Sequence, residues 1–246
     1  MKNFRQLGSR TPGHPEIETP GVEVCTGPLG QGVSNAVGMA IAEANLAATF
    51  NKENFAVFDN YIYALCGDGC LEEGISHEAA SLAGHLGLGH LIILYDDNNI
   101  TIDGRTDLSF SEDVLKRYES YGWHVQRVED GNHDVVAIAK AIEHAKQETS
   151  KPSIIAIKTL IGFGSALENT SSVHGSPLGW DKIDAVREKF GFEAGKYFEV
   201  PEDVLQFYRA AGERGSKKAS EWNTMMKQYQ EQYPTEVSLS IVSIIY

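Results

Sequence analysis

The stretch YIYALCGDG at residues 61–69 and the stretch LIILYDDNN at residues 91–99 decide the fold of this chain. In each stretch, an apolar run that is typical of a buried strand ends directly at polar residues. A helical pattern at residues 71–86 separates the two runs, so we expect two neighbouring parallel strands. Because parallel strands end at the same edge of a sheet, Asp68 and Asn98 should lie close together where open α/β sheets bind ligands.

Strand-like and helical stretches alternate along much of the remaining sequence. A small-residue amphipathic helix is expected at about residues 32–50, ahead of the first strand. An alternating strand at residues 123–128, a helix at residues 134–148 and an apolar strand at residues 153–157 follow the two strands described above. This order predicts the α/β class, with a parallel sheet flanked by helices.

The composition excludes several classes of function. The formal net charge of −13 is spread along the chain and disfavours nucleic acid and acidic membranes as partners. The 3 cysteines, Cys25, Cys66 and Cys70, form no CxxC pair, which favours a reducing compartment. Residues 1–10 lack the apolar core of a secretory signal, and the apolar residues 237–246 are too few to span a bilayer. We therefore expect a cytoplasmic protein that binds neither nucleic acid nor membranes.

The two polar turns offer only oxygen ligands. A carboxylate, an amide oxygen and nearby backbone carbonyls suit Mg²⁺ or Ca²⁺, and a cation beside a glycine turn that opens a helix can bind a diphosphate. Each turn alone has ordinary turn composition. Their position at the ends of consecutive strands favours a metal–diphosphate site over two unrelated turns. A dinucleotide site and a P-loop are disfavoured, because neither glycine motif occurs in the required context.

Two histidines and two glutamates are further candidates. His14 and His174 lie in glycine- and proline-containing loops, where an imidazole can hydrogen-bond a phosphate or a substrate hydroxyl near neutral pH. The alternative for a lone loop histidine is a solvated surface residue. Glu73 and Glu78 follow the glycine turn on the next helix, so they are either solvated charges or part of an acidic site near Asp68.

Several motifs, in this order along the chain, resemble those of the transketolase family. They are FRQLGSRTPGHPE at residues 4–16, TGPLGQG at 26–32, GDGCLEEG at 67–74, DDNNITIDG at 96–104 and SVHG at 172–175. The resemblance extends from about residue 2 to residue 233. It implies an α/β domain of the type that binds the diphosphate of thiamine diphosphate, with its parallel sheet flanked by helices.

The resemblance implies a role for each matching position in binding the metal and the diphosphate. Asp68 and Asn98, together with the backbone carbonyl of Ile100, would coordinate Mg²⁺ or Ca²⁺ along with diphosphate oxygens. Gly69 would lie against the diphosphate. Gly67 is also expected to be a cofactor-binding residue.

Other matching positions would contact the rest of the cofactor and the substrate. The resemblance places Gly27 and Leu29 against the thiamine rings. His14 would face the reacting carbon and the hydroxyls of the donor. His174 would contact the diphosphate and the substrate, and Ile161 would line the same side of the site.

The family transfers a two-carbon ketol unit from a ketose phosphate to an aldose phosphate in the pentose phosphate pathway. The nucleophile is the C2 carbanion of the cofactor, so the protein mainly orients and polarises it. The resemblance therefore implies sugar-phosphate substrates. It also places Glu73 and Glu78 in an acidic network at the dimer interface, which implies a homodimer or pairing with a pyrimidine-binding domain.

The resemblance covers most of one cofactor-binding domain only. An opening strand–helix unit and the pyrimidine-binding and C-terminal domains find no match, and the glutamate that activates the aminopyrimidine belongs to the unmatched part. We therefore expect little or no ketol transfer by the isolated chain. The alternatives are a non-catalytic truncated fragment, a regulatory partner of full-length protomers, or part of a dihydroxyacetone synthase. The expected organisation is an incomplete cofactor-binding domain at residues 1–180, its helical extension at 181–236, and an apolar tail of unknown status at 237–246.

Overall fold

The structure is a computed structural model that describes the backbone of residues 2–245 and the side chains of residues 2–239. It divides the chain into two compact units. The first unit comprises Met1–Ile41 and Tyr61–Lys196, and the second unit comprises Ala42–Asn60 and Tyr197–Tyr246. The three-part division expected from the sequence stays a prediction.

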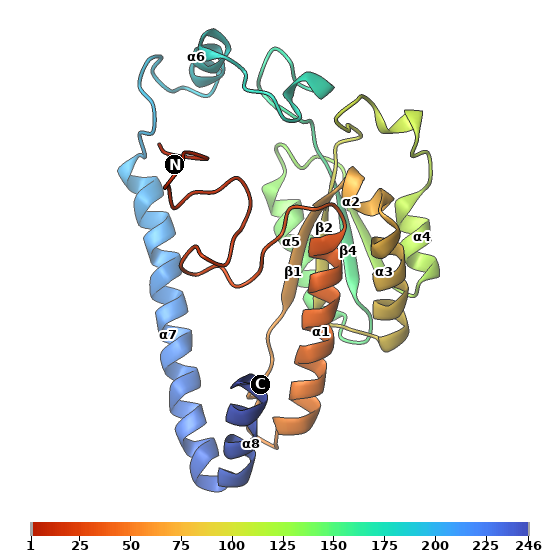
Figure 1. Cartoon of the computed structure of the whole chain (residues 1–246), viewed down its shortest axis with the longest axis vertical. Coiled ribbons are helices and arrows are strands. Elements are labelled where there is room, and N and C mark those ends of the chain that lie inside the picture. Colours follow the sequence, from red (N-terminus) through yellow and green to blue (C-terminus); the bar gives the residue numbers. More distant parts are fainter. Residues whose placement is uncertain (1, 246) are drawn as a thin grey trace. The chain divides into compact units, whose positions relative to one another are not determined.

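The first unit is built on a 4-stranded sheet with the strand order β1-β2-β4-β3. Its strands are β1 (Ile62–Gly67), β2 (Leu91–Asp97), β3 (His124–Val128) and β4 (Ser153–Lys158). All neighbouring strands run parallel, so the predicted parallel sheet is confirmed. Gly67 pairs with Asp96 in the last position of the β1–β2 ladder, and both carboxyl ends lie at one edge of the sheet (Figure 1).

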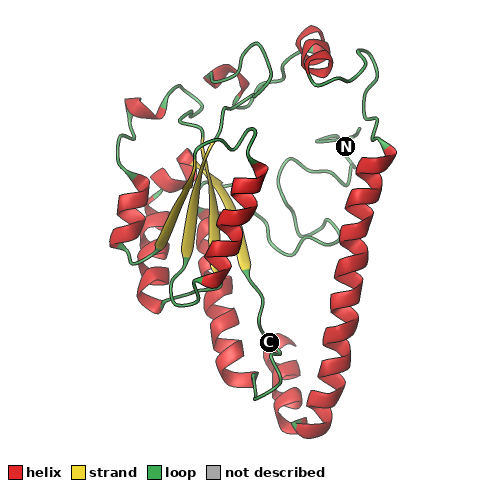
Figure 2. Ribbon diagram, turned by 180° about the vertical axis from the view of Figure 1, so that it is seen from behind, coloured by secondary structure: helices red, strands yellow, loops and turns green. Residues whose placement is uncertain are grey.

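Helices cover both faces of this sheet (Figure 2). Ile93 and Ile154 belong to a hydrophobic cluster with residues of α1 (Gln31–Phe50), α3 (Gly74–Leu86) and α4 (Val114–Ser120). Ile92 and Ile155 belong to a cluster with residues of α5 (Val135–Gln147). Neighbouring residues of a strand point to opposite faces, and both faces are covered, which explains the uninterrupted apolar runs in the sequence. The first unit also contains the short 3-10 helices η1 (Thr106–Leu108) and η2 (Ser171–Val173) and the helix α6 (Trp180–Lys189).

A separate short helix, α2 (Asp68–Glu72), lies between β1 and α3. The sequence pattern predicts one helix over residues 71–86, and the structure corrects this prediction. Glu73 has an extended backbone, with φ −72° and ψ 135°, so α2 ends there and α3 begins at Gly74. The glycine turn therefore leads into a helix of its own, whose first residue is Asp68.

The second unit contains the end of α1 together with α7 (Glu202–Gln232) and α8 (Pro234–Ile245). The hydroxyl of Tyr229 is buried and donates a hydrogen bond to the carbonyl of Phe50 at 2.7 Å. Val237 is buried in the same hydrophobic cluster as Tyr229. The expected apolar tail therefore begins within a packed helix.

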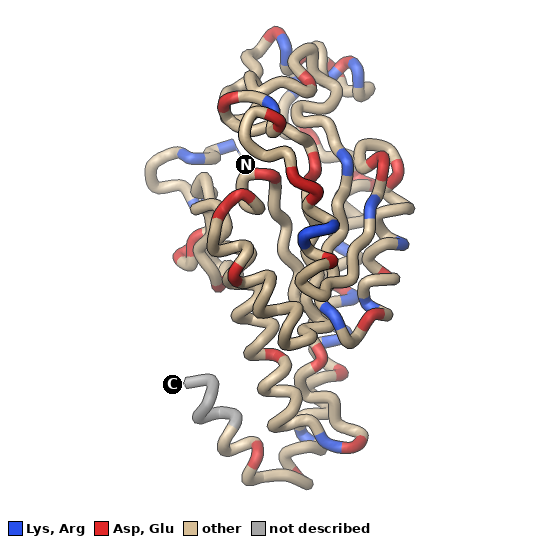
Figure 3. Tube along the Cα trace, turned by 90° about the vertical axis from the view of Figure 1, so that its right-hand side faces the viewer, with Lys and Arg blue, Asp and Glu red and all other residues tan. Residues whose placement is uncertain are grey.

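The distribution of charge follows the pattern seen in the sequence. Acidic and basic residues are interspersed along the described chain (Figure 3). Among the described residues, no helix has both the length and the apolar character needed to cross a membrane.

A substitution at Gly84 tests how closely α3 packs on the loop that follows α4. A Cβ at Gly84 would lie 1.9 Å from the carbonyl oxygen of Tyr121, so Gly84→Ala must push these two segments apart. We expect this substitution to lower the free energy of unfolding by about 2 kcal/mol or more, measured by urea denaturation followed by circular dichroism.

The matched control is Gly38→Ala in α1, where a Cβ would meet no atom within 4 Å. Because alanine is the better helix former, this variant should be more stable than the wild type by about 0.5–1 kcal/mol. Equal effects of the two substitutions would contradict the close approach at Gly84.

Candidate functional site

Most of the residues that the sequence singles out line one cavity at the carboxyl ends of β1 and β2. This cavity, called the site cavity below, has a volume of about 640 Å³. Its lining includes the predicted residues His14, Gly27, Leu29, Gly67, Asp68, Gly69, Glu73, Asn98, Ile100 and His174. They come from the N-terminal loop, from both polar turns and from the loop after β4, so the fold brings together segments that are far apart in the sequence.

Asp68 is almost fully buried, with 3% of its surface exposed. Its Oδ2 accepts a hydrogen bond from the backbone N–H of Asn99 at 2.9 Å, and its Oδ1 accepts one from the hydroxyl of Tyr95. Burial raises the pKa of the Asp68 carboxyl, the hydrogen bond from Tyr95 opposes the shift, and the nearby Asp97 adds to it. An ionised Asp68 therefore lowers folding stability at neutral pH, and a bound cation would offset this cost.

The turn after β2, which carries the second motif, is shaped by hydrogen bonds within it. Asn98 Oδ1 accepts a hydrogen bond from the backbone N–H of Ile100 at 2.9 Å. Asn99 has a left-handed backbone with φ 61°, which asparagine adopts more readily than most residues. The N–H of Thr101 donates to the carbonyl of Gly104 at 2.7 Å and closes the following turn. Asn98 and Ile100 both line the site cavity as a result.

Charged side chains from the neighbouring strands hold this turn in place. Asp97 is buried, and it accepts hydrogen bonds from Asn99 Nδ2 at 2.8 Å and from Arg127 Nη1 at 2.9 Å. Lys158 Nζ lies 3.7 Å from Asp97 Oδ1 and donates to the side-chain oxygen of Asn99. The ends of β2, β3 and β4 are therefore joined by one network beside the Asn98–Ile100 turn.

The residues present fit a divalent cation with a diphosphate. The Asp68 carboxylate accepts two hydrogen bonds and the Asn98 amide oxygen accepts one, so both keep lone pairs for a further ligand. Such hard oxygen donors suit Mg²⁺ or Ca²⁺. A Cβ at Gly67 would meet no atom within 4 Å, so the glycine turn adjoins open space. A Cβ at Gly69 would lie 3.2 Å from Leu29 Cδ1, so a side chain there would crowd Leu29.

The two loop histidines also reach the site cavity. His14 packs against Gly27, which has a φ of +154°. A Cβ added at Gly27 would lie 3.0 Å from His14 Cγ. His174 follows η2, and its N–H donates to the carbonyl of Ser171 at 3.0 Å. The fold thus places both imidazoles at the candidate site, while their contacts with ligands stay predictions.

Two predicted residues, Ile161 and Glu78, lie outside the lining of the site cavity. The carbonyl of Ile161 accepts a hydrogen bond from the N–H of Asn169 at 2.8 Å in the loop after β4. Glu78 is exposed on α3. The expected roles of Ile161 in cofactor binding and of Glu78 in an acidic network stay predictions.

Several lining residues were not predicted from the sequence. They are Cys70, Glu72, Thr101, Ile102, Asp103 and Ser109. Most of them lie within the two quoted glycine and asparagine motifs, so their proximity to Asp68 and Asn98 was the available signal. Among the described residues, Glu72 Oε1 is buried and has no hydrogen-bond partner.

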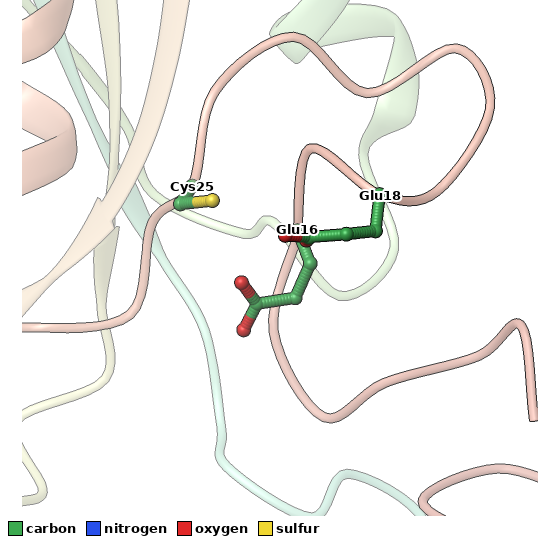
Figure 4. A group of neighbouring side chains, drawn as sticks. All are labelled: Glu16, Glu18 and Cys25. Atoms are coloured by element: carbon green, nitrogen blue, oxygen red, sulfur yellow. The ribbon is translucent and has the colours of Figure 1, made fainter. Parts of the chain in front are cut away.

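A separate group of possible metal ligands lies in the N-terminal loop, at Glu16, Glu18 and Cys25 (Figure 4). One ligand atom of each lies within 4.8 Å of the others. The Sγ of Cys25 accepts a hydrogen bond from the backbone N–H of Ile17 at 3.4 Å, and Glu18 is exposed. Exposed acidic groups commonly lie together without an ion, so we assign no metal to this group.

Comparison with known proteins identifies close relatives. The family model described as "Transketolase, thiamine diphosphate binding domain" matches residues 1–242. Transketolase 1 from Saccharomyces cerevisiae is 57% identical over 235 residues, which are 95% of this chain and 35% of that protein. A transketolase from Nostoc sp. is 56% identical over 240 residues, covering 97% of this chain and 36% of that protein.

Solved structures agree with these matches. Transketolase from Leishmania mexicana superimposes with a TM-score of 0.95 at 48% identity, over 98% of this chain and 36% of that one. Transketolase from Pichia stipitis in complex with sedoheptulose 7-phosphate gives a TM-score of 0.93 at 51% identity, over 95% of this chain and 35% of that one. The chain thus spans little more than a third of the length of these relatives.

Tyr95 tests how the buried Asp68 carboxylate is supported. Tyr95→Phe removes the hydroxyl that donates to Asp68 and leaves the other contacts of the ring in place. Because hydrogen bonds to charged groups contribute about 1.5–3 kcal/mol, we expect the free energy of unfolding at neutral pH to fall by about that amount in urea denaturation.

Tyr63→Phe on β1 is the matched control, because Tyr63 is 48% exposed. This variant should remain within about 0.5 kcal/mol of the wild type, as surface substitutions usually do. The assigned hydrogen bond is wrong if Tyr95→Phe is as stable as Tyr63→Phe.

Proposed function

The chain belongs to the transketolase family, and from this premise we propose that it supplies the metal- and diphosphate-binding part of a thiamine-diphosphate-dependent transferase. The reaction is transfer of a two-carbon ketol unit from a ketose phosphate to an aldose phosphate, in the pentose phosphate pathway. The observation that carries this proposal is the site cavity, which Asp68, Asn98 and Ile100 line together with the open glycine turn.

In this proposal the metal and the diphosphate occupy the side of the site cavity formed by the two polar turns. The Asp68 carboxylate, the Asn98 amide oxygen and the Ile100 carbonyl would hold Mg²⁺ or Ca²⁺. Gly67 and Gly69 would present backbone rather than side chains to the diphosphate, which would allow close approach. The cation would stabilise the Asp68 carboxylate electrostatically and so replace the hydration that the carboxylate loses on burial.

The remaining lining residues would orient the cofactor rings and the substrate. Thiamine diphosphate, when bound, supplies the nucleophilic carbon for the transfer. Gly27 and Leu29 line the cavity and would contact the thiamine rings, and His14 packs on Gly27. His14 and His174 would hydrogen-bond the substrate hydroxyls and the diphosphate, and we keep Ile161 as a proposed neighbour of His174.

The substrates and partners of the whole protein are part of the same proposal. The Pichia stipitis relative was crystallised with sedoheptulose 7-phosphate, which supports sugar phosphates as substrates. We propose pairing as a homodimer, or with a pyrimidine-binding domain, through an acidic network that includes Glu73 and Glu78. The free cysteines Cys25, Cys66 and Cys70 are consistent with a cytoplasmic location.

Binding of the cofactor by this chain tests the site assignment. Calorimetry should show that thiamine diphosphate binds only with Mg²⁺ or Ca²⁺ present, and more tightly than thiamine monophosphate. Asp68→Ala and Asn98→Ala should each weaken the metal-dependent affinity at least tenfold, or about 1.4 kcal/mol, because each removes a metal ligand.

Asp107→Ala is the matched control, because the Asp107 side chain is 66% exposed in η1, after the Asn98 turn. It should bind the cofactor like the wild type. Unchanged metal-dependent affinity in both Asp68→Ala and Asn98→Ala would show that the site assignment is wrong.

A chimera tests the transferase function. This chain would replace the matching 235 residues of Saccharomyces cerevisiae transketolase 1, with which it is 57% identical. We expect the chimera to transfer a ketol unit from a ketose phosphate to an aldose phosphate, and the Asp68→Ala chimera to lose this activity. A folded chimera that binds thiamine diphosphate but transfers no ketol unit would contradict the proposed reaction.

A further inference from the structure

The side chain of Arg117 connects α4 to the short helix α2. It is 12% exposed, and its Nη2 donates a hydrogen bond to the backbone carbonyl of Leu71 at 3.1 Å. Leu71 is fully buried and lies near the end of α2, three residues after Asp68. Arg117 therefore contacts the helix that carries the proposed metal ligand, although Arg117 itself does not line the site cavity.

The guanidinium group of Arg117 is held on several sides. Its Nε lies 2.6 Å from Glu112 Oε1 as an ion pair without hydrogen-bond geometry, and its Nη1 lies 2.6 Å from both ring nitrogens of His77 on α3. The rings of Phe110 and Tyr118 lie 5.9 Å and 5.6 Å from the guanidinium carbon. Because the guanidinium is planar and its donors point in fixed directions, these contacts define where its bond to the α2 carbonyl can form.

Helix α2 depends on such contacts, because it has only 5 residues. A helix of this length is not stable by itself, and the carbonyls at its end have no partner within the helix. The Cys70 carbonyl accepts from the Ser76 hydroxyl at 2.5 Å, and the Leu71 carbonyl accepts from Arg117. These two hydrogen bonds hold the end of α2, the helix that begins with Asp68.

We propose that Arg117 is a positioning residue for the metal site, an inference that rests on the proposed cofactor binding of this chain. By holding the end of α2, Arg117 keeps the Asp68 carboxylate in the orientation that a cation bound with Asn98 requires. Its loss leaves every proposed ligand present but lets α2 shift relative to the Asn98 turn.

The proposal predicts that the two candidate cations respond differently. Mg²⁺ requires near-ideal octahedral geometry with short bonds, whereas Ca²⁺ accepts more ligands at longer and more variable distances. A displaced Asp68 should therefore weaken Mg²⁺ binding more than Ca²⁺ binding. A general loss of stability would reduce the affinity for both ions by a similar factor.

The experiment titrates Mg²⁺ and Ca²⁺ separately into the chain with saturating thiamine diphosphate, by calorimetry at a temperature where circular dichroism shows each variant to be folded. Arg117→Ala should weaken the apparent Mg²⁺ affinity about tenfold or more and the Ca²⁺ affinity clearly less. Arg117→Lys should recover part of the Mg²⁺ affinity, since a lysine can donate one hydrogen bond to the Leu71 carbonyl.

Two controls separate positioning from stability. Lys116→Ala removes the neighbouring side chain on α4, which is 79% exposed, and should leave both affinities unchanged. Trp123→Phe removes the 2.8 Å hydrogen bond from Trp123 Nε1 to the Ala80 carbonyl, which joins the segment after α4 to α3 rather than to α2. It should lower stability without changing the ratio of the Mg²⁺ and Ca²⁺ affinities.

The outcomes distinguish this inference from the proposed function. If the wild type shows no metal-dependent binding of thiamine diphosphate, the proposed function is wrong and the role of Arg117 is wrong with it. If the wild type binds but the arginine variants keep the wild-type ratio of the two affinities, only the positioning role is wrong. If Arg117→Ala does not fold, Arg117→Lys provides the same comparison.

Discussion

Parallel pairing of β1 with β2 is the constraint on which the site depends. The ladder ends with Gly67 beside Asp96, so the residues that follow each strand leave the sheet at the same edge. Asp68 and the Asn98 turn are neighbours for this reason, and the hydrogen bond from the Asn99 N–H to Asp68 joins them directly. A shift of the register by one residue would turn every side chain of β1 to the opposite face and separate the two turns.

Buried hydrogen bonds and an ion pair stabilise the site against the cost of burying the Asp68 carboxylate. Asp68 is a carboxylate in a buried position with Asp97 nearby, and both effects raise its pKa. The fold compensates with hydrogen bonds from Tyr95 and Asn99, while Arg127 pairs with Asp97. Such an acidic cluster would gain stability from the cation that we propose, which would link folding of the site to its occupation.

The sequence predicted the sheet and most of the candidate site because those signals are local. Apolar runs that end in Gly-Asp-Gly and Asp-Asp-Asn-Asn indicate strands and turns without reference to the rest of the chain. The sequence does not reveal the break at Glu73, because the apolar periodicity continues through the residue whose backbone is extended. Glu78 is exposed on α3, which agrees with one of the two alternatives that the sequence left open for it, a solvated charge.

The sequence by itself determined the α/β class and the parallel strands, and it indicated the candidate oxygen ligands, since these follow from periodicity and turn chemistry. Only the tertiary structure decided which distant groups support them. In the sequence, Tyr95 is one more residue of an apolar strand, and only the structure shows that its hydroxyl donates to Asp68. Arg117 likewise has no distinguishing feature in the sequence, and only the structure shows that it contacts Leu71. The physical reason is that a buried polar group must find its partner across the fold, and such partners are separated along the chain by distances that no local pattern records.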